Sequence, residues 1–289
     1  KNGYSLRGMI MELYLKKNRV FYFDGEEVVA NSGHSYEISD RLGAGGNGVV
    51  YECIDQNGSL YAIKFLLHFT EKSKKRFGQE ISLMKRLHHP HIIKYIDDGF
   101  IKLRENRRSF QEQQALFVIM EKADLNLKDL LSQTSKIPYD IYAPQFRGLC
   151  EALTEIHQFA IHRDIKPENI LVKGETWVLS DFGLCEFLNA DEHCDITGEN
   201  EKIGPVFWIS PEAVNKYYFG MNDIGTYSDV YQLGMIFAFV LMKRFPGGIL
   251  SENDFIGTDE FIGSVILKTL ANDYTKRPEN GKELLELIN

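Results

Sequence analysis

A glycine-rich segment at residues 43–48, GAGGNG, places the strongest constraint on how this chain can fold. Glycines there allow backbone N–H groups to approach an anion such as a phosphate without obstruction by side chains. Dinucleotide-binding folds use the same pattern, but in those folds a helix follows the loop. Here residues 49–54 (VVYECI) consist mostly of β-branched and aromatic residues, and a turn at residues 57–58 follows. The segment is therefore expected to join two strands and to cover phosphate groups, which disfavours a dinucleotide-binding fold.

The apolar pattern along the chain divides it into two parts. Residues 37–122 read mostly as strands, with one helix at about residues 72–87. From residue 125 onward helical patterns dominate, and helices are expected at about residues 143–158, 210–214, 229–242, 261–270 and 282–288. The sequence therefore predicts an α+β chain with a small β-rich part at 37–122 and a larger helical part at 123–289.

Residues 1–36 are predicted to be an N-terminal extension made of a helix and a hairpin. Residues 20–23 and 28–29 read as the two strands of the hairpin, separated by a turn at residues 24–25. The helix is expected from the spacing of four apolar residues: Leu6, Met9, Ile10 and Leu13. No catalytic residue is expected in this extension. We therefore predict a packing or linker role, with a regulatory role as the alternative.

Lys64 lies in an apolar strand-like segment, residues 61–64 (YAIK), that follows the glycine-rich loop. A lysine among apolar neighbours requires an anionic partner. Glu80 is the best candidate, because it shares a face of the expected helix with Phe77 and Met84. An isolated lysine on a strand is usually exposed to solvent, but the position of Lys64 after the glycine-rich loop favours a site that binds phosphate.

Residues 162–169, HRDIKPEN, carry the strongest chemical signal in the chain. Asp164 can accept a proton from a hydroxyl group and orient it as a nucleophile. Lys166 can neutralise charge on a transferred phosphoryl group. Asn169 offers an amide oxygen to a hard cation, and Asp181, in the Asp-Phe-Gly tripeptide at residues 181–183, offers a carboxylate to the same ion.

Taken together, these motifs resemble the eukaryotic-type (Hanks-type) serine/threonine protein kinase family, and the resemblance covers residues 37–289. It implies a bilobal protein-kinase fold with an ATP cleft between an N-lobe at 37–122 and a C-lobe at 123–289. It also implies ATP and Mg²⁺ as cofactors, with Asn169 and Asp181 as metal ligands. Glu212, in the Ser-Pro-Glu at residues 210–212, would pair with Arg277, and Asp229 would brace the catalytic loop.

The same resemblance assigns residues to nucleotide binding. Met120 corresponds to the gatekeeper beside adenine, and residues 121–123 correspond to the hinge. The full set that the family would use to bind ATP is Gly43, Gly45, Gly48, Val50, Ala62, Lys64, Met120, Glu121, Ala123 and Leu171.

Two residues give conflicting indications of whether the phosphate acceptor is serine or threonine. Lys166 favours serine or threonine, whereas Pro205 stands where such relatives usually carry threonine. Two alternatives stay open: a pseudokinase scaffold that binds ATP without turnover, and a kinase-fold enzyme that phosphorylates small molecules. Thr197 is the candidate for phosphorylation beside Arg163, although an acidic loop could neutralise Arg163 without phosphate. That loop contains Asp191, Glu192, Asp195, Glu199 and Glu201.

The overall composition limits the kinds of binding partner that we expect. A net charge of −8 disfavours nucleic acid and anionic membranes, so a protein substrate and ATP are the expected partners. The longest apolar run, residues 233–242, is too short to cross a bilayer. The four cysteines form no C-x-x-C pair, which is typical of a reducing compartment, and we expect a cytoplasmic location.

Overall fold

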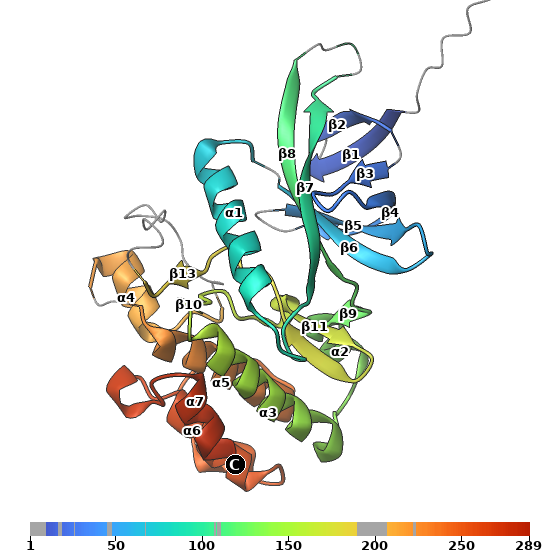
Figure 1. Ribbon diagram of the computed structural model, residues 1–289. Coiled ribbons are helices and arrows are strands. Elements are labelled where there is room, and N and C mark those ends of the chain that lie inside the picture. Colours follow the sequence, from blue (N-terminus) through green and yellow to red (C-terminus); the bar gives the residue numbers. More distant parts are fainter. Residues whose placement is uncertain are drawn as a thin grey trace, which may run out of the picture. The chain divides into compact units, whose positions relative to one another are not determined.

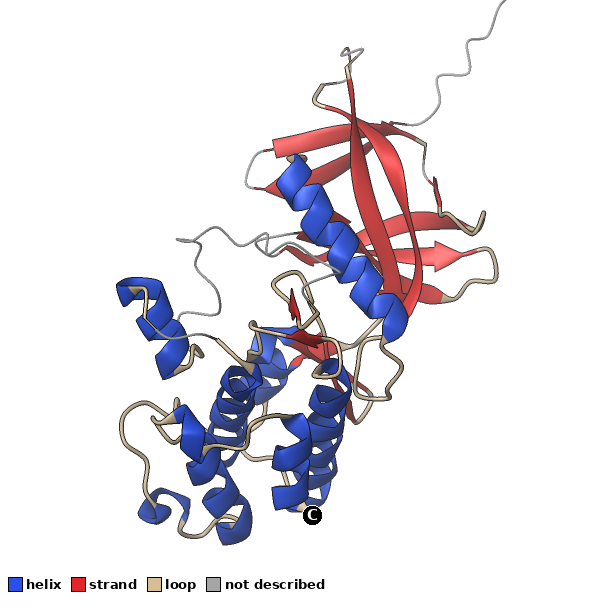
Figure 2. Ribbon diagram, turned by 60° about the vertical axis from the view of Figure 1, so that its left-hand side comes forward, coloured by secondary structure: helices blue, strands red, loops and turns tan. Residues whose placement is uncertain are grey.

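The structure is a computed structural model that describes residues 10–16, 19–25, 27–44, 48–66, 68–106, 108, 111–189, 207–221 and 224–289. The chain divides into two compact units. The first comprises Lys1–Ser82 and Lys94–Lys122, and the second comprises Leu83–Ile93 and Ala123–Asn289. Strands dominate the first unit and helices dominate the second (Figure 2).

The first unit is built on a curled, 8-stranded antiparallel sheet in the order β1-β2-β7-β8-β6-β5-β4-β3 (Figure 1). Helix α1, Glu71–Arg86, lies beside this sheet in both ribbon views, and its last residues belong to the second unit. The strands are β1 Ile10–Lys16, β2 Arg19–Asp24, β3 Glu27–Val29, β4 Ser35–Ala44, β5 Gly48–Asp55, β6 Leu60–Leu66, β7 Tyr95–Arg104 and β8 Glu112–Glu121.

The helix and hairpin predicted for the extension are wrong within the described residues. Ile10–Lys16 is strand β1, which pairs antiparallel with β2. The segments expected to pair with each other, β2 and β3, instead join the sheet at different places, because β2 pairs with β1 and β7 while β3 pairs with β4. A few apolar residues at helical spacing cannot form a stable helix alone, whereas the open edge of β2, which is itself paired with β7, offers backbone partners to a strand.

The core of the first unit is built from both the extension and the later strands. Phe65 of β6 and Phe117 of β8 pack edge to face with ring centroids 5.8 Å apart. Leu13 of β1 and Phe21 of β2 are buried in the same cluster. Burying one such side chain contributes roughly 1.5–3 kcal/mol. The extension is therefore part of this core.

Gly99 shows how closely the extension approaches β7. A Cβ atom on Gly99 would lie 2.7 Å from the Phe117 ring and 3.3 Å from the Cα atom of Ala30. Any side chain at position 99 would force the Phe117 ring to shift and would press against the backbone of Ala30. The turn itself is closed by hydrogen bonds from the Ala30 nitrogen to the His34 carbonyl, at 2.9 Å, and from the Gly33 nitrogen to the Ala30 carbonyl, at 3.0 Å.

The second unit consists of helices with two small antiparallel sheets. One sheet has the order β12-β11-β9, and β10 pairs with β13 in the other. The helices are α2 Leu127–Gln133, α3 Tyr139–Ile156, α4 Pro211–Phe219, α5 Thr226–Met242, α6 Glu260–Thr269 and α7 Gly281–Ile288. The short strands are β9 Leu125–Asn126, β10 Ala160–Ile161, β11 Ile170–Lys173, β12 Thr176–Leu179 and β13 Glu186–Phe187.

Helix α5 lies at the centre of this unit. Its Phe237 ring stacks on Phe146 of α3 at a centroid distance of 3.8 Å. Its Gly234 allows close approach of α6, since a Cβ atom there would lie 1.9 Å from the Thr269 Oγ1. Each helix predicted for this part is present, and α2 was not predicted. Among the residues that the structure describes, no helix is both long enough and apolar enough to span a bilayer.

Candidate active site

Gly43 and Gly48 lie at the ends of the paired strands β4 and β5, as predicted for the glycine-rich loop. Gly45, the third predicted glycine, lies outside the described residues. Gly48 is required by its surroundings, because a Cβ atom there would lie 2.9 Å from Cε of Lys64 and 3.0 Å from the carbonyl oxygen of Phe65. Strand β5 therefore begins with its Gly48 backbone directly against the lysine side chain.

Lys64 and Glu80 form the ion pair that the sequence predicted. The Lys64 Nζ donates to the Glu80 Oε1 at 2.5 Å, and the two side chains are only 7% and 3% exposed. Phe77, one turn earlier on α1, is buried as well and helps to place Glu80 on the inner face of the helix. Removing one partner would leave a buried charge uncompensated, so this pair strongly constrains where both side chains lie.

Val50, Ala62 and Met120 lie on the same face of the sheet as Lys64. Val50 is the register partner of Lys64, and Ala62 is the register partner of Met120. Side chains of register partners point to one side, as do side chains two residues apart on a strand. Three apolar side chains beside a lysine and a glycine-rich loop are suited to bind a nucleotide, with the apolar side chains against the planar base and the lysine near the phosphates.

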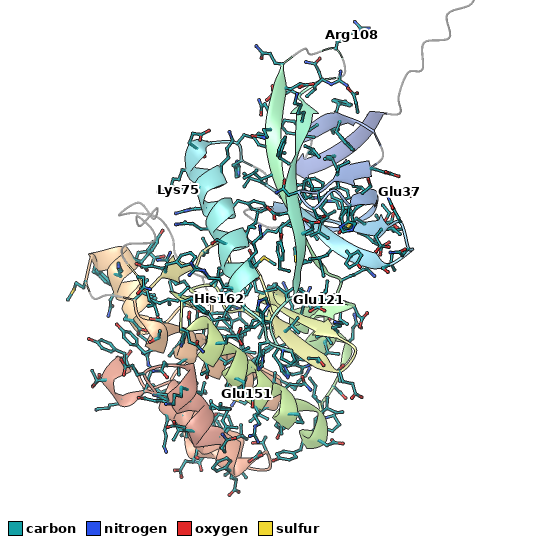
Figure 3. All side chains as sticks on the ribbon, in the orientation of Figure 1. Glu37, Lys75, Arg108, Glu121, Glu151 and His162 are labelled. Atoms are coloured by element: carbon teal, nitrogen blue, oxygen red, sulfur yellow. The ribbon has the colours of Figure 1, made fainter. Side chains whose placement is uncertain are left out.

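The predicted hinge begins where β8 ends. The backbone nitrogen of Glu121 donates to the carbonyl of Lys94 at 3.0 Å, and the Glu121 carboxylate accepts from the Lys94 nitrogen at 3.1 Å. Figure 3 labels Glu121 at this end of the strand. Ala123 and Leu171 belong to the second unit, where Leu171 is half-buried on β11 and pairs with Asn126 of β9.

In the second unit, Asp164 is held by two neighbours in the HRDIKPEN segment. The Lys166 Nζ lies 3.0 and 2.8 Å from the two carboxylate oxygens. The Asn169 side-chain nitrogen donates to the Asp164 backbone carbonyl at 2.9 Å and to its Oδ2 at 2.8 Å. These contacts fix the direction of the carboxylate and place a lysine ammonium beside it.

Burial raises the pKa of Asp164, while the charge and the hydrogen bond of Lys166 oppose that rise. The charge of Asp181 adds to the rise. A carboxylate with a raised pKa is a better proton acceptor than a free aspartate, provided that it remains ionised at the working pH.

Asp229, at the start of α5, braces the backbone of this loop as predicted. Its carboxylate accepts from the backbone nitrogens of His162, at 2.6 Å, and Arg163, at 2.8 Å. Sequence reasoning missed two further contacts: His157 Nε2 lies 3.0 Å from the Asp229 Oδ2, and the Gln232 Oε1 accepts from the Ile165 nitrogen at 3.1 Å. Gln232 lies three residues after Asp229, so helical spacing alone could have identified it.

Asp181 follows β12 and is joined to Asn169 through Ser180. Both the backbone nitrogen and the hydroxyl of Ser180 donate to the Asn169 carbonyl, at 2.9 and 2.8 Å. Asp181 has a left-handed backbone conformation with φ 63°. Such a conformation costs a non-glycine residue of order 1–3 kcal/mol and is concentrated at functional sites. The next residue, Phe182, packs its ring 5.2 Å from that of His162, which is fully buried and labelled in Figure 3.

Arg163 makes a contact that the sequence did not suggest. Its guanidinium donates to the Glu186 carboxylate of β13 at 2.7 Å, and its Nε donates to the Leu184 carbonyl at 2.8 Å. The acidic residues expected to neutralise Arg163, together with Thr197 and Pro205, lie outside the described residues.

The predicted pair of Glu212 and Arg277 is present and bidentate. The two guanidinium nitrogens lie 2.9 and 3.0 Å from the two carboxylate oxygens, and the Ser228 hydroxyl adds a bond of 2.6 Å to Glu212. Burial alone would raise the pKa of Glu212. The hydrogen bonds from Arg277 and Ser228 and the charge of Arg277 outweigh burial and lower the pKa. This pair joins the start of α4 to the segment before α7.

Comparison with known proteins gives a consistent result. Residues 36–289 match the family described as protein kinase domain. The chain is 29% identical over 235 residues to serine/threonine-protein kinase cds1 of Schizosaccharomyces pombe, covering 76% of this chain and 47% of that protein. It is 29% identical over 270 residues to serine/threonine-protein kinase dst1 of Dictyostelium discoideum, covering 86% of this chain and 34% of that protein. It is 28% identical over 285 residues to serine/threonine-protein kinase pkn2 of Myxococcus xanthus, covering 88% of this chain and 32% of that protein. The chain thus spans about half or less of the length of these relatives.

Proposed function

Because the chain belongs to the protein kinase family, we propose that it is a serine/threonine protein kinase, which transfers the γ-phosphoryl group of ATP to hydroxyl groups of proteins, its own included. The observation that carries this proposal is the arrangement around Asp164, whose carboxylate is held at 2.8 Å by both Lys166 and Asn169. Phosphoryl transfer depends mainly on positioning and on electrostatic stabilisation, and this arrangement supplies both.

Each group has a distinct task in this proposal. Asp164 orients the acceptor hydroxyl and receives its proton. Lys166, beside it, stabilises the negative charge of the transferred phosphoryl group. Lys64, fixed by Glu80, binds phosphate oxygens of ATP under the glycine-rich loop. The resemblance to the kinase family assigns adenine binding to Val50, Ala62, Met120 and Glu121 of the first unit and to Ala123 and Leu171 of the second.

Asn169 and Asp181 are suited to Mg²⁺. The Asn169 side-chain nitrogen is engaged by Asp164, so its amide oxygen is the atom that would ligate a cation. Asp181 contributes a carboxylate, and oxygen atoms are the ligands that this ion prefers. When bound, Mg²⁺ would neutralise the charge of the nucleotide phosphates.

The two alternatives find less support. A pseudokinase scaffold usually lacks a metal-binding or phosphate-binding group, whereas Lys64, Asp164, Asn169 and Asp181 are all present in this chain. A small-molecule kinase would have no use for the lysine at position 166 or the Ser-Pro-Glu segment, both of which the resembling family uses for peptide acceptors. Lys166 also favours serine or threonine over tyrosine as the acceptor.

The test is phosphoryl transfer from radiolabelled ATP to generic protein acceptors and to the chain itself. Asp164→Asn should lower the rate by on the order of 10²-fold or more, because it removes the proton acceptor. Its thermal unfolding and ATP binding should stay close to wild type. The matched control is Asp140→Asn on the exposed surface of α3, which should leave the rate unchanged. Wild-type turnover in Asp164→Asn would contradict the assignment, and ATP binding without turnover in the wild type would favour the scaffold.

A further inference from the structure

Strands β1 and β2 precede the segment that matches the protein kinase domain, which begins at residue 36. They are nevertheless part of the first unit's core. Along β2 the inward positions Phe21 and Phe23 are buried, at 1% and 6% exposure, while Asp24 is exposed. This alternation is that of a strand with one face in a core. The two strands therefore contribute to the packing of the unit that carries Lys64 and Glu80.

Strand β2 is fixed to the sheet from one side. Tyr22 is in register with Arg104 at the end of β7, and the Arg104 guanidinium forms an ion pair with Asp24. A second anchor lies further along the chain, where the Asn31 nitrogen donates to the Asp98 carbonyl at 2.8 Å and its side chain donates to the Asp98 carboxylate at 3.1 Å. The extension is thus attached to β7 at two places, Arg104 at its end and Asp98 in its first half.

The inner face of β2 contacts the segment that leads into α1. The ring of Phe21 packs edge to face on Phe69, with centroids 5.4 Å apart and planes at 80°. Phe69 directly precedes Thr70, whose hydroxyl accepts from the Ser73 nitrogen at 3.2 Å and whose carbonyl accepts from the Lys74 nitrogen at 2.9 Å. Thr70 therefore caps α1, and an apolar residue before a cap sets the direction in which the helix starts.

We propose that Phe21 is a positioning residue for phosphoryl transfer, which fixes the start of α1 through Phe69 and so holds Glu80 beside Lys64. The proposal rests on the proposed function, in which the Lys64–Glu80 pair binds ATP. A helix of this length behaves as a rigid rod, so a shift at Thr70 moves Glu80 as well. The bond from Lys64 to Glu80 is 2.5 Å long, and a displacement of about 1 Å would take it outside hydrogen-bonding range.

Phe21→Ala is the first test. It should raise the KM for ATP and lower kcat/KM by about 2-fold to 10-fold, which is the range that the energy of an aromatic pair allows. Amide hydrogen exchange should accelerate in residues 71–80 of α1 and stay unchanged in α5. The matched control is Phe23→Ala on the same strand, whose ring lies beside Gly25 in the turn after β2. It should lower the melting temperature to a similar extent without changing the KM for ATP.

Repeating the Phe21→Ala substitution in a chain that lacks Glu80 distinguishes a positioning role of Phe21 from a general loss of stability. In Glu80→Gln, where the Lys64–Glu80 ion pair is already lost, Phe21→Ala should cause no further fall in kcat/KM although it still lowers the melting temperature. If Phe21→Ala does not fold, Phe69→Leu removes the ring from the less buried side of the same contact and should give the same loss.

Two results would overturn the proposal: an unchanged KM for ATP in the folded variants that lack the Phe21–Phe69 contact, or an equal loss of kcat/KM with and without Glu80. A wild-type chain that does not transfer phosphate would contradict the proposed function instead. The hydrogen-exchange comparison would then still decide whether Phe21 holds α1.

Discussion

The Arg163 guanidinium donates to the Glu186 carboxylate across 2.7 Å and thereby joins the HRDIKPEN segment to the segment that follows Asp181. Arg163 is 6% exposed at its side chain and directly precedes Asp164. Among the residues that the structure describes, Glu186 therefore supplies negative charge to Arg163, while Thr197, the candidate for phosphorylation, lies outside them. Arg163 itself has a left-handed backbone conformation with φ 65°, as does Asp181 with φ 63°, five residues before Glu186.

Activity is accordingly expected to depend more on Glu186 than on Thr197. Glu186→Ala should lower kcat of phosphatase-treated enzyme about 10-fold, because a hydrogen bond between charged groups contributes roughly 1.5–3 kcal/mol. Thr197→Ala should retain most of the activity. Kinetics of both variants and mass spectrometry of the loop after incubation with ATP provide the measurement. Glu175→Ala, in the exposed turn between β11 and β12, is the control. Loss of activity in Thr197→Ala would instead support the hypothesis that phosphorylation of Thr197 switches the enzyme on.

The pH dependence of the reaction should reveal the contact between Lys166 and Asp164. Because Lys166 opposes the rise in the Asp164 pKa, Lys166→Met should raise that pKa further. In the proposed function the ionised Asp164 carboxylate is the active form, so activity should be lost as pH falls through this pKa. The acid limb of the profile of kcat/KM against pH should therefore move to higher pH in Lys166→Met. Lys128→Met, which removes an exposed partner of Glu168, should leave the limb in place, and a shift to lower pH would contradict the assignment.

Metal dependence tests the pair Asn169 and Asp181. EDTA should stop phosphoryl transfer, and added Mg²⁺ should restore it. Asp181→Ala should weaken Mg²⁺-dependent nucleotide binding, because it removes a carboxylate ligand. Isothermal titration with ATP, with and without Mg²⁺, makes the comparison. Transfer that continues in EDTA, or equal Mg²⁺ enhancement in Asp181→Ala and wild type, would exclude the proposed metal site.

The pair of Glu212 and Arg277 should contribute strongly to stability. Arg277→Met removes one partner of a buried ion pair, and such changes lower the free energy of unfolding by about 3–5 kcal/mol. Urea denaturation measures the loss. Arg244→Met removes the partner of Asp254 at a largely exposed position and should cost about 0–1 kcal/mol. A similar loss of unfolding free energy in both variants would show that the buried ion pair contributes no more to stability than the exposed one.

The pair of Glu212 and Arg277 also predicts the direction in which stability changes with pH. The pKa of Glu212 is lowered in the folded chain, so its contribution to stability is fully present above the unfolded pKa. It is lost as pH falls through the lowered folded pKa. Wild type should therefore lose more stability than Arg277→Met over this acid range, and parallel losses would contradict the assigned cause.

Much of the fold and site could be predicted from local patterns. The strand–loop–strand around Gly48 and the helix carrying Glu80 are read from spacing over a few residues, and the fold class and family are confirmed. The contacts of Asp164 with Lys166 and Asn169 join residues two and five positions apart, so the HRDIKPEN segment brings them together almost by itself. The pair of Lys64 and Glu80 is 16 residues apart and required the additional argument that a buried lysine needs an anion.

Tertiary structure decided what these local patterns could not. The spacing of apolar residues suggested a helix near Ile10, yet this segment became β1 because an unpaired sheet edge satisfies a strand's backbone groups. Arg163 contacts Glu186 and Phe21 contacts Phe69, but no sequence motif indicated that either pair would meet. The sequence alone therefore identified the residues to which the proposed chemistry is assigned, since each motif is short and its chemistry is local. Only the folded chain revealed the contact of Arg163 with Glu186 and that of Phe21 with Phe69, because those contacts exist only after distant segments have packed.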